Sequence, residues 1–170
     1  MARNWMRIFF ASLAIIMLAG CSSAEEQVDD GIENAKVAFQ GDAEKPNEKI
    51  NNLKLFLPSG FSIEEKSDES NIILSKGKES FILFINPNEL PGSRLYYDLM
   101  MADTNLKIIE ENTFEQNGRF GFAAVIENSG DQYELITSIG GIKLTTISKE
   151  HNVAENLEKM MMIVRSITTN

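Results

Sequence analysis

Glycine-containing turn signals divide the stretch from Leu106 to Lys149 into four strand-length segments, which leaves few folds open to this part of the chain. The signals are Asn117-Gly118, Ser129-Gly130-Asp131 and Gly140-Gly141. Asn-Gly and Gly-Gly tolerate the positive φ that tight hairpin turns require. Because hairpin turns join antiparallel neighbours, the stretch is predicted to form an antiparallel meander.

The second segment of this meander, "RFGFAAVIE", has two different faces. In a strand, successive side chains point to opposite faces. Large side chains alternate with small ones here, so one face carries Phe120, Phe122, Ala124 and Ile126 and the other carries Gly121, Ala123 and Val125. The small side chains leave room for a helix to lie close to that face.

A strand–turn–strand segment and then a hairpin are expected before the meander. "NLKLFLPSGFSIEEK" contains a strand, a turn at Pro58-Ser59-Gly60 and a second short strand, and "NIILSKGKESFILFIN" turns at Lys76-Gly77-Lys78. In the strand after that turn, both alternating sets are apolar: Phe81, Leu83 and Ile85 on one side, Ile82 and Phe84 on the other. We therefore expect this strand to be central and covered on both faces.

Two helices are expected in the remaining segments. In "SRLYYDLMMAD", Leu95, Leu99 and Ala102 share one helical face, with Tyr96 and Met100 alongside, and Ser93 can cap the helix. In "HNVAENLEKMMMIVRSI", Asn152 and Glu155 match a cap with a reciprocal carboxylate. The apolar stripe of this last helix comprises Val153, Leu157, Met160, Met161 and Val164.

The run Met160-Met161-Met162 has two readings. Thioethers favour copper(I), so three adjacent methionines suggest a soft-metal site. Consecutive helical residues point about 100° apart, because a turn holds 3.6 residues. Three adjacent sulfurs therefore cannot converge on one ion, and core packing is the better interpretation.

The order of these elements resembles a known fold. A Leu-Pro-Ser-Gly-Phe opening at Leu57 to Phe61 is followed by strands, a helix, an antiparallel meander and a closing helix ending in "IVRSI". This pattern resembles the PsbP/Mog1-like fold, and the resemblance covers about 120 residues. It implies an α+β fold in which helices sandwich a central antiparallel sheet, and a binding or accessory role. It carries no functional residues over to this chain.

The N-terminus has the layout of an export signal. Arg3 and Arg7 precede an apolar run from Ile8 to Leu18, which is too short to span a bilayer. The sequence Leu18-Ala19-Gly20-Cys21 then resembles the lipobox of bacterial lipoproteins. That resemblance implies cleavage before Cys21 and diacylglycerol on its sulfur. The alternative, a buried or stray free thiol, leaves the leader and the small residues before Cys21 unexplained.

These features predict three regions: residues 1–20 as a lipoprotein signal peptide, 21–48 as an acidic tether and 49–170 as a single α+β domain. The tether region holds eight acids and few large apolar residues between Ser22 and Glu48. A flexible chain of this length would reach about 30 Å. The spacing of Val28, Ile32, Ala35 and Phe39 leaves a docked helix over residues 28–39 as an open alternative.

Charge and cysteine content restrict the partners. Loss of residues 1–20 would remove two arginines and no acids, which takes the formal net charge from -9 to -11. Such an acidic surface repels phosphate backbones, so nucleic acid is not an expected partner. Cys21 is the only cysteine, so an internal disulfide is impossible and stability must come from core packing.

The sequence offers few candidates for catalysis. His151 is the only histidine, and a lone histidine in a loop is usually a solvated residue. No Gly-x-Ser-x-Gly elbow occurs, and the glycines at 130, 140 and 141 are explained by hairpin turns, so a phosphate loop is not expected. We expect no catalytic residue, cofactor or metal, and therefore no enzyme.

Three weaker patterns are further candidates for a catalytic, metal or ligand site. The adjacent acids are Glu64-Glu65, Glu110-Glu111 and Asp29-Asp30, which are expected to be solvated rather than a glycosidase pair. The oxygen-rich segments Ser67 to Ser70 and Glu127 to Glu134 lack the ordered ligand pattern of a calcium loop. Arg94, Tyr96 and Tyr97 form either an aromatic ligand patch or ordinary helix packing, and packing is favoured.

The expected function is that of a lipid-anchored lipoprotein on the extracytoplasmic face of the cell membrane. It would act as a non-enzymatic interaction or accessory module, with the membrane and another envelope protein as partners. The alternative is a lipoprotein that binds or weakly hydrolyses a small molecule in a pocket between sheet and helix. An exposed apolar patch on a sheet face favours the first, and a closed concave pocket the second.

Overall fold

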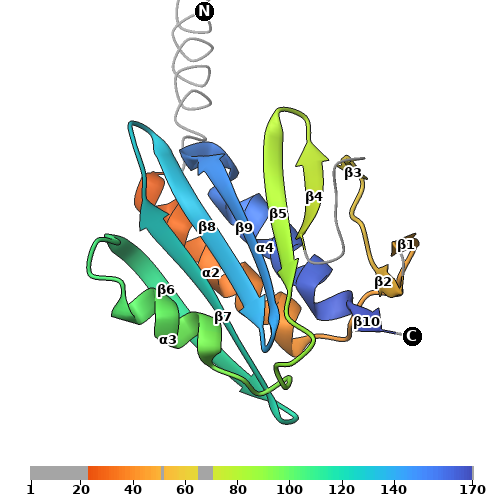
Figure 1. Ribbon diagram of the computed structural model, residues 1–170. Coiled ribbons are helices and arrows are strands. Elements are labelled where there is room, and N and C mark those ends of the chain that lie inside the picture. The colour runs from red at the N-terminus through yellow and green to blue at the C-terminus, as the bar shows by residue number, and fades with distance from the viewer. Residues whose placement is uncertain (1–22, 51, 65–70, 170) are drawn as a thin grey trace, which may run out of the picture.

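The computed structural model describes residues 23–50, 52–64 and 71–169 (Figure 1). The helices are α2 (Ala24–Gln40), α3 (Leu95–Ala102), the short 3-10 helix η1 (Glu150–Asn152) and α4 (Val153–Ser166). The strands are β1 (Glu48–Ile50), β2 (Leu53–Leu55), β3 (Phe61–Ile63), β4 (Asn71–Lys76), β5 (Glu79–Ile85), β6 (Ile108–Gln116), β7 (Arg119–Glu127), β8 (Gln132–Ile139), β9 (Ile142–Lys149) and β10 (Thr168–Thr169).

An antiparallel sheet forms the centre of the molecule. Its seven strands are ordered β3-β4-β5-β9-β8-β7-β6, and a small three-stranded sheet has the order β1-β2-β10. The predicted meander is strands β6 to β9, and β9 pairs with β5, which joins the meander to the preceding hairpin. The expected α+β class, an antiparallel sheet between helices, is confirmed.

The turn signals lie where the sequence places them. Asn117 and Gly118 both have positive φ, at 52° and 73°, and connect β6 to β7. Gly130 and Gly140 also have positive φ and lie in the next two turns. The left-handed backbone is available to glycine without steric cost, which explains why these positions end the strands.

Helices α2 and α4 cover one face of the sheet (Figure 1). The predicted apolar stripe of α4 is confirmed, since Val153, Leu157, Met160, Met161 and Val164 are all buried in the main core. The methionine run therefore contributes core packing, with Met162 less buried than its two neighbours.

The acidic segment after Cys21 differs from the expected tether. Residues Ala24–Gln40 form a 17-residue helix, with the hydroxyl of Ser23 accepting a hydrogen bond from the Glu26 amide at its start. Its buried face includes Val28, Ile32, Ala35 and Phe39, which belong to the main core. The docked helix that the spacing leaves open over residues 28–39 is therefore present, and it extends over Ala24–Gln40. Composition misses this helix because its acids all lie on the solvent side.

The small face of β7 receives α2 as expected. A Cβ atom placed on Gly121 would lie 2.7 Å from Cε2 of Phe39, closer than real Cβ contacts allow. The ring of Phe39 also packs against that of Phe114, with centroids 5.5 Å apart. The glycine in β7 is thus required for the close approach of α2.

The other face of the sheet carries α3 (Figure 1). The buried residues of this helix are Tyr96 and Met100, which the sequence places alongside its apolar face, whereas Leu99 at the centre of that face is 58% exposed. α3 spans only eight residues and rests on the large side chains of β7, which select its aromatic side. Ser93 contributes to its start by accepting a hydrogen bond from the Leu95 amide at 3.2 Å.

Strand β5 is central, but its outward face is covered only in part. Phe81 and Leu83 are fully buried beneath the helices, while Ile82 on the opposite face is 49% exposed. The expectation of two covered faces is therefore only partly met. Phe84 packs against Tyr96 of α3, with ring centroids 6.0 Å apart, but α3 does not extend to Ile82.

Candidate functional site

The face of the sheet that carries α3 is only partly covered. α3 packs over outward side chains of β7 and β8, and beyond it the outward side chains of β5, β9 and the start of β8 are exposed or partly buried. We call this area the open face. It comprises Ser80, Ile82, Phe84, Glu134, Lys143, Thr145 and Ile147.

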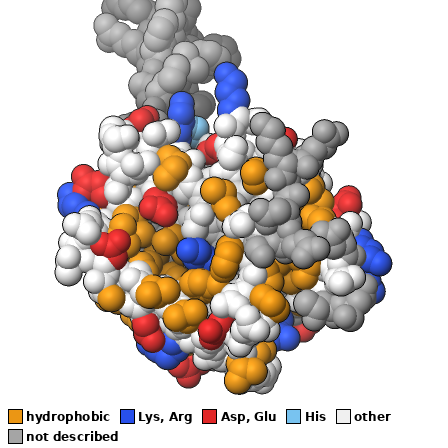
Figure 2. All heavy atoms as spheres, in the orientation of Figure 1, with side chains coloured by type: hydrophobic (Ala, Val, Ile, Leu, Met, Phe, Trp, Pro, Cys, Tyr) orange, Lys and Arg blue, Asp and Glu red, His pale blue; other side chains and the backbone are white. Residues whose placement is uncertain are grey.

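Two isoleucines on different strands form the apolar centre of the open face. Ile82 is 49% exposed and Ile147 is 42% exposed. Thr145, two residues before Ile147 on β9, is the cross-strand partner of Ile82. Figure 2 shows this face, with apolar side chains gathered over α3 and the neighbouring strands. Contiguous exposed apolar side chains of this kind are typical of interaction surfaces.

Opposite charges flank this apolar centre. Glu134 is the cross-strand partner of Ile147 on β8, and Lys143 is the partner of Phe84 on β9. The ammonium group of Lys143 lies 5.2 Å from the centroid of the Tyr96 ring, a cation–π contact that holds it toward α3. The open face therefore presents an apolar strip with a carboxylate on one side and an ammonium on the other.

The aromatic residues of α3 pack rather than form a ligand patch. Tyr96 is buried, and Tyr97 stacks edge-on against Phe120 while its hydroxyl donates to Oε1 of Glu111 at 3.2 Å. Burial raises the pKa of Tyr97, and the negative charge of Glu111 raises it further. The guanidinium of Arg94 lies 4.2 Å from the Phe120 ring centroid. Arg94, Tyr96 and Tyr97 therefore stabilise the packing of α3 on the sheet.

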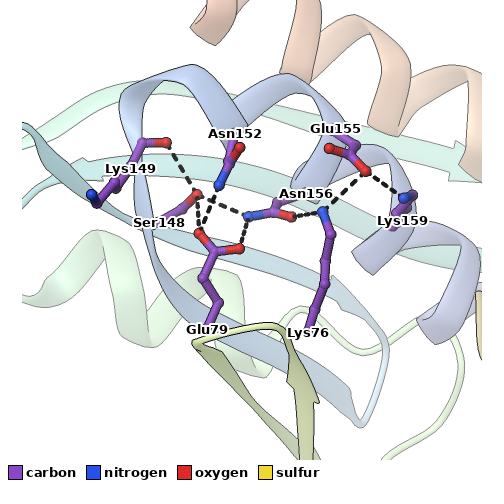
Figure 3. Close-up of polar contacts among 8 residues, drawn as sticks. All are labelled: Lys76, Glu79, Ser148, Lys149, Asn152, Glu155, Asn156 and Lys159. Carbon is purple, nitrogen blue, oxygen red and sulfur yellow. Dashed lines mark hydrogen bonds and ion pairs between the residues drawn. The ribbon is translucent and has the colours of Figure 1, made fainter. Parts of the chain in front are cut away.

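A polar cluster connects the β4–β5 hairpin to the start of α4 (Figure 3). At its centre is Asn156, which is fully buried and donates from Nδ2 to Glu79 at 3.1 Å and to Ser148 at 2.9 Å. Its Oδ1 accepts from the ammonium of Lys76 at 3.0 Å. A buried amide with both ends satisfied is typical of a structural network.

Asn152 occupies the N-cap position of α4, but its side chain makes no capping hydrogen bond. The amide of Asn152 donates to Glu79 Oε1 at 3.1 Å. Glu155 binds Lys76 and Lys159 instead of returning to the cap. The expected reciprocal cap is therefore wrong, because the side chain of Asn152 binds the carboxylate of Glu79 instead of the backbone of α4. The hydrogen bonds from Lys159 and Lys76 hold the pKa of Glu155 below its ordinary value.

The polar cluster contains a serine but no activated nucleophile. Ser148 is fully buried, and its hydroxyl lies 3.4 Å from Glu79 and 3.2 Å from the carbonyl oxygen of Lys149. His151 is exposed in η1, as the sequence predicts for a loop residue. Within the described residues, no hydrogen bond joins His151 to Ser148, and a buried hydroxyl cannot reach a substrate. The arrangement therefore fixes α4 against the sheet.

A broad hollow of about 1090 Å³ connects the polar cluster to the open face. Its lining includes Lys78, Lys149 and His151 at one end and Ile82 and Ile147 at the other. It is open to solvent and lies along the sheet surface and edge. The space between the sheet and the helices is instead filled by core side chains such as Phe39, Leu157 and Met160. A smaller hollow of about 290 Å³ remains where the sheet meets the end of α4, and its lining includes Ile85, Ile142 and Val164. It is open to solvent, so it is not the closed pocket that would favour the alternative function.

The carboxylate patterns of the sequence do not converge. Asp29 and Asp30 lie exposed on α2, and Glu110 and Glu111 lie on the edge strand β6. No group of three potential metal ligands occurs in residues 23–50, 52–64 and 71–169. Glu65 and the segment from Ser67 to Ser70 lie outside the described residues.

The predicted lipidation site, Cys21, and the signal peptide also lie outside the described residues. Among the helices of the described part, none has the length and apolar content needed to cross a membrane. The open face and the polar cluster were both missed at the sequence level. Ile82 and Ile147 differ little from core isoleucines in their sequence context, and Asn156 falls inside an apolar helical stripe.

Comparison with known proteins gives likenesses among solved structures. No protein-family model matches the chain, and no curated protein matches it in sequence. The solution structure of cyanobacterial PsbP from Synechocystis sp. PCC 6803 is similar with a TM-score of 0.45 and 9% sequence identity. The match covers 70% of this chain and 87% of that protein. The likeness concerns the arrangement of helices and strands.

Proposed function

We propose that the protein is a lipid-anchored, extracytoplasmic module of the cell envelope that binds another envelope protein through the open face. Its role is to hold or modulate that protein without catalysing a reaction. The anchor is diacylglycerol on Cys21, for which the leader and the Leu18-Ala19-Gly20-Cys21 sequence are the support. Two acyl chains on one residue suffice for stable membrane attachment.

The observation that carries the proposal is the exposure of Ile82 and Ile147 on the open face. The opposite face of the same strands is buried by two helices, whereas this one is left to solvent. Burying the exposed apolar area against a partner is favourable by about 25 cal/mol per Å². The face therefore gains free energy from association.

The composition of the open face fits a protein partner. Interfaces typically have an apolar centre with charged groups near the rim. Ile82 and Ile147 supply the centre, and Glu134 and Lys143 supply charges of both signs. A complementary partner has an apolar strip with a basic group opposite Glu134 and an acidic group opposite Lys143.

Site-specific photo-crosslinking in cells tests this directly. A photoreactive residue replaces Ser80 on the open face in the full-length chain, and a matched one replaces Asp30 on the exposed side of α2. We expect a covalent adduct with a defined envelope protein from position 80 and none from position 30. The same adduct should be lost when Ile82→Lys and Ile147→Lys are combined.

Val37→Lys is the control for the double variant. Val37 is 60% exposed on α2, so the change also replaces a surface apolar residue with lysine but leaves the open face intact. The adduct should persist in this variant. Loss of the adduct in both variants, or an adduct consisting only of a second copy of this chain, would show that the open face is not the docking surface for an envelope protein.

A further inference from the structure

We propose that one end of the domain lies directly against the lipid headgroups, so that the open face stands upright beside the membrane. This end, which we call the near end, is formed by the start of α2, by η1 and by the β4–β5 and β7–β8 turns; the opposite end of the strands is the far end. The inference rests on the proposed function, because it requires the lipid on Cys21. It adds an orientation and a membrane-facing surface that lipidation alone does not define.

The first support is the short chain between the anchor and the fold. Ser23 caps α2, and its hydroxyl accepts the Glu26 amide at 3.2 Å. Two peptide steps separate Cys21 from Ser23, and each spans about 3.8 Å between Cα atoms. The start of α2 therefore lies within about 8 Å of the anchored residue, compared with about 30 Å for a flexible tether of the full segment.

The second support is that α2 is fixed to the rest of the domain. Ala35 and Phe39 are buried in the main core, and Nε of Arg165 donates to the carbonyl oxygen of Phe39 at 3.2 Å. At Gly31 the two helices approach so closely that an added Cβ would lie 3.2 Å from Cα of Ala154. The anchor therefore restrains the whole domain and not only a mobile arm.

The third support is the direction of α2. Gly31 lies beside the start of α4 and Phe39 beside its end, so the two helices run the same way. The carbonyl oxygen of Gln40 accepts from Gln116, next to the Asn117–Gly118 turn. That turn is consequently at the far end from the start of α2, as Figure 1 shows. Nine-residue strands such as β7 separate the two ends by about 30 Å.

Charge disfavours two sides of the domain as the membrane-facing surface. The exposed side of α2 carries Asp29, Asp30 and Glu33, and the edge strand β6 carries three further glutamates. Anionic headgroups repel these surfaces. The near end carries exposed Lys78 and Lys149 together with Glu25, Glu26 and Asp131, so its charges are mixed. On the exposed side of α2 the acids outnumber the single cation Lys36, which is paired with Glu33. The upright orientation therefore keeps most carboxylates away from the bilayer.

The orientation restricts the partner to proteins of the same membrane. With its strands upright, the open face points sideways, and its exposed isoleucines lie within about the 30 Å length of the strands from the headgroups. A partner must therefore present its apolar strip close to the bilayer surface. An integral membrane protein, or another protein anchored in the same leaflet, meets this requirement.

Fluorescence quenching on vesicles measures the orientation. The full-length protein, processed and lipidated in cells, is reconstituted into phosphatidylcholine vesicles containing phosphatidylglycerol and a headgroup spin label. Cys21 is the only cysteine and is blocked by acylation, so Lys78→Cys at the near end or Arg119→Cys at the far end supplies one free thiol for a fluorophore. We expect several-fold stronger quenching at position 78 than at position 119.

An insertion variant separates orientation from anchoring. Twelve Gly and Ser residues between Ser22 and Ser23 extend the link to a reach of about 20 Å. The variant should float with the vesicles and melt like the parent, but the quenching difference should largely disappear. The same twelve residues appended after Asn170 should leave the difference unchanged.

The outcomes distinguish this inference from the proposed function. A parent protein that floats with vesicles but shows equal quenching at both positions, or stronger quenching at 119, overturns the upright orientation alone. A protein that does not float overturns the lipid anchor, and the orientation with it. Retention of the full difference in the Ser22–Ser23 insertion overturns the role of the short link.

Discussion

At the scale of single residues, Asn156 determines how the last helix meets the sheet. Its amide bridges Glu79 and Ser148, and its carbonyl oxygen accepts from Lys76. The four residues lie on four different elements, β4, β5, β9 and α4, and the amide of Asn156 is fully buried. Removal of one member leaves several buried polar groups without partners, which costs more than one hydrogen bond contributes.

We expect Asn156→Ala to lower the free energy of unfolding by about 1–3 kcal/mol, because three hydrogen-bond partners lose their contact in a buried site. Urea denaturation followed by circular dichroism measures this. Asn112→Ala on the exposed surface of β6 is the matched control and should stay within about 0.5 kcal/mol of the parent. Equal midpoints for both variants would show that the polar cluster does not stabilise the fold.

At the scale of elements, sequence patterns specify the parts of the fold that local chemistry controls. The turns at Asn117-Gly118 and Gly140-Gly141 contain residues with positive φ, a conformation that glycine and asparagine adopt more readily than other residues. The alternation in β7 likewise separates Gly121 from its large neighbours, which is why the side receiving α2 is predictable. How much of each strand a helix covers depends on segments distant in the sequence, so local patterns do not predict it.

The missed features all depend on contacts between distant segments. Ile82 has the same apolar neighbours as a doubly buried strand residue, but α3 is too short to cover it. Asn152 has a sequence suited to capping, but Glu79, 73 residues away, takes its amide. The helix at Ala24–Gln40 is masked by acidic composition, although its apolar spacing over Val28 to Phe39 leaves it open as an alternative. Burial and partner choice therefore need the tertiary structure.

The close contact between α2 and α4 predicts a sharp effect at Gly31. A Cβ there would lie 2.8 Å from Cδ1 of Leu157 and 3.2 Å from the backbone of Ala154. The leucine tip can move, but the backbone of α4 cannot. Gly31→Val should therefore destabilise the fold by about 1–3 kcal/mol through overpacking, although valine itself favours a helix more than glycine does.

Asp30→Val is the control for this variant, because residue 30 is adjacent in α2 but exposed. It introduces the same β-branched side chain without entering the contact with α4. Thermal unfolding should show a lower midpoint for Gly31→Val than for Asp30→Val. A Gly31→Val variant that melts at or above the parent temperature would mean that α2 does not pack as closely as the structure has it.

At the scale of the whole molecule, anchor, helix and open face form one mechanical unit. The proposed lipid on Cys21 is only two residues from the cap of α2, and α2 is continuous with the core that supports the sheet. The sheet in turn holds Ile82 and Ile147 on adjacent strands with a fixed spacing. If Cys21 is lipidated as proposed, position relative to the membrane is transmitted to the open face through packed elements.

This coupling predicts that Cys21→Ser separates folding from function. The buried residues of α2 begin at Val28, so the described core does not include position 21 and the purified variant should melt like the parent. Without the two acyl chains, the variant should leave the membrane fraction, and the adduct formed from position 80 should fall sharply because the partner is held at the bilayer. Fractionation, melting and photo-crosslinking on the same preparations measure the three effects. A soluble variant that still forms the adduct at the parent level would show that the open face recognises its partner independently of the membrane.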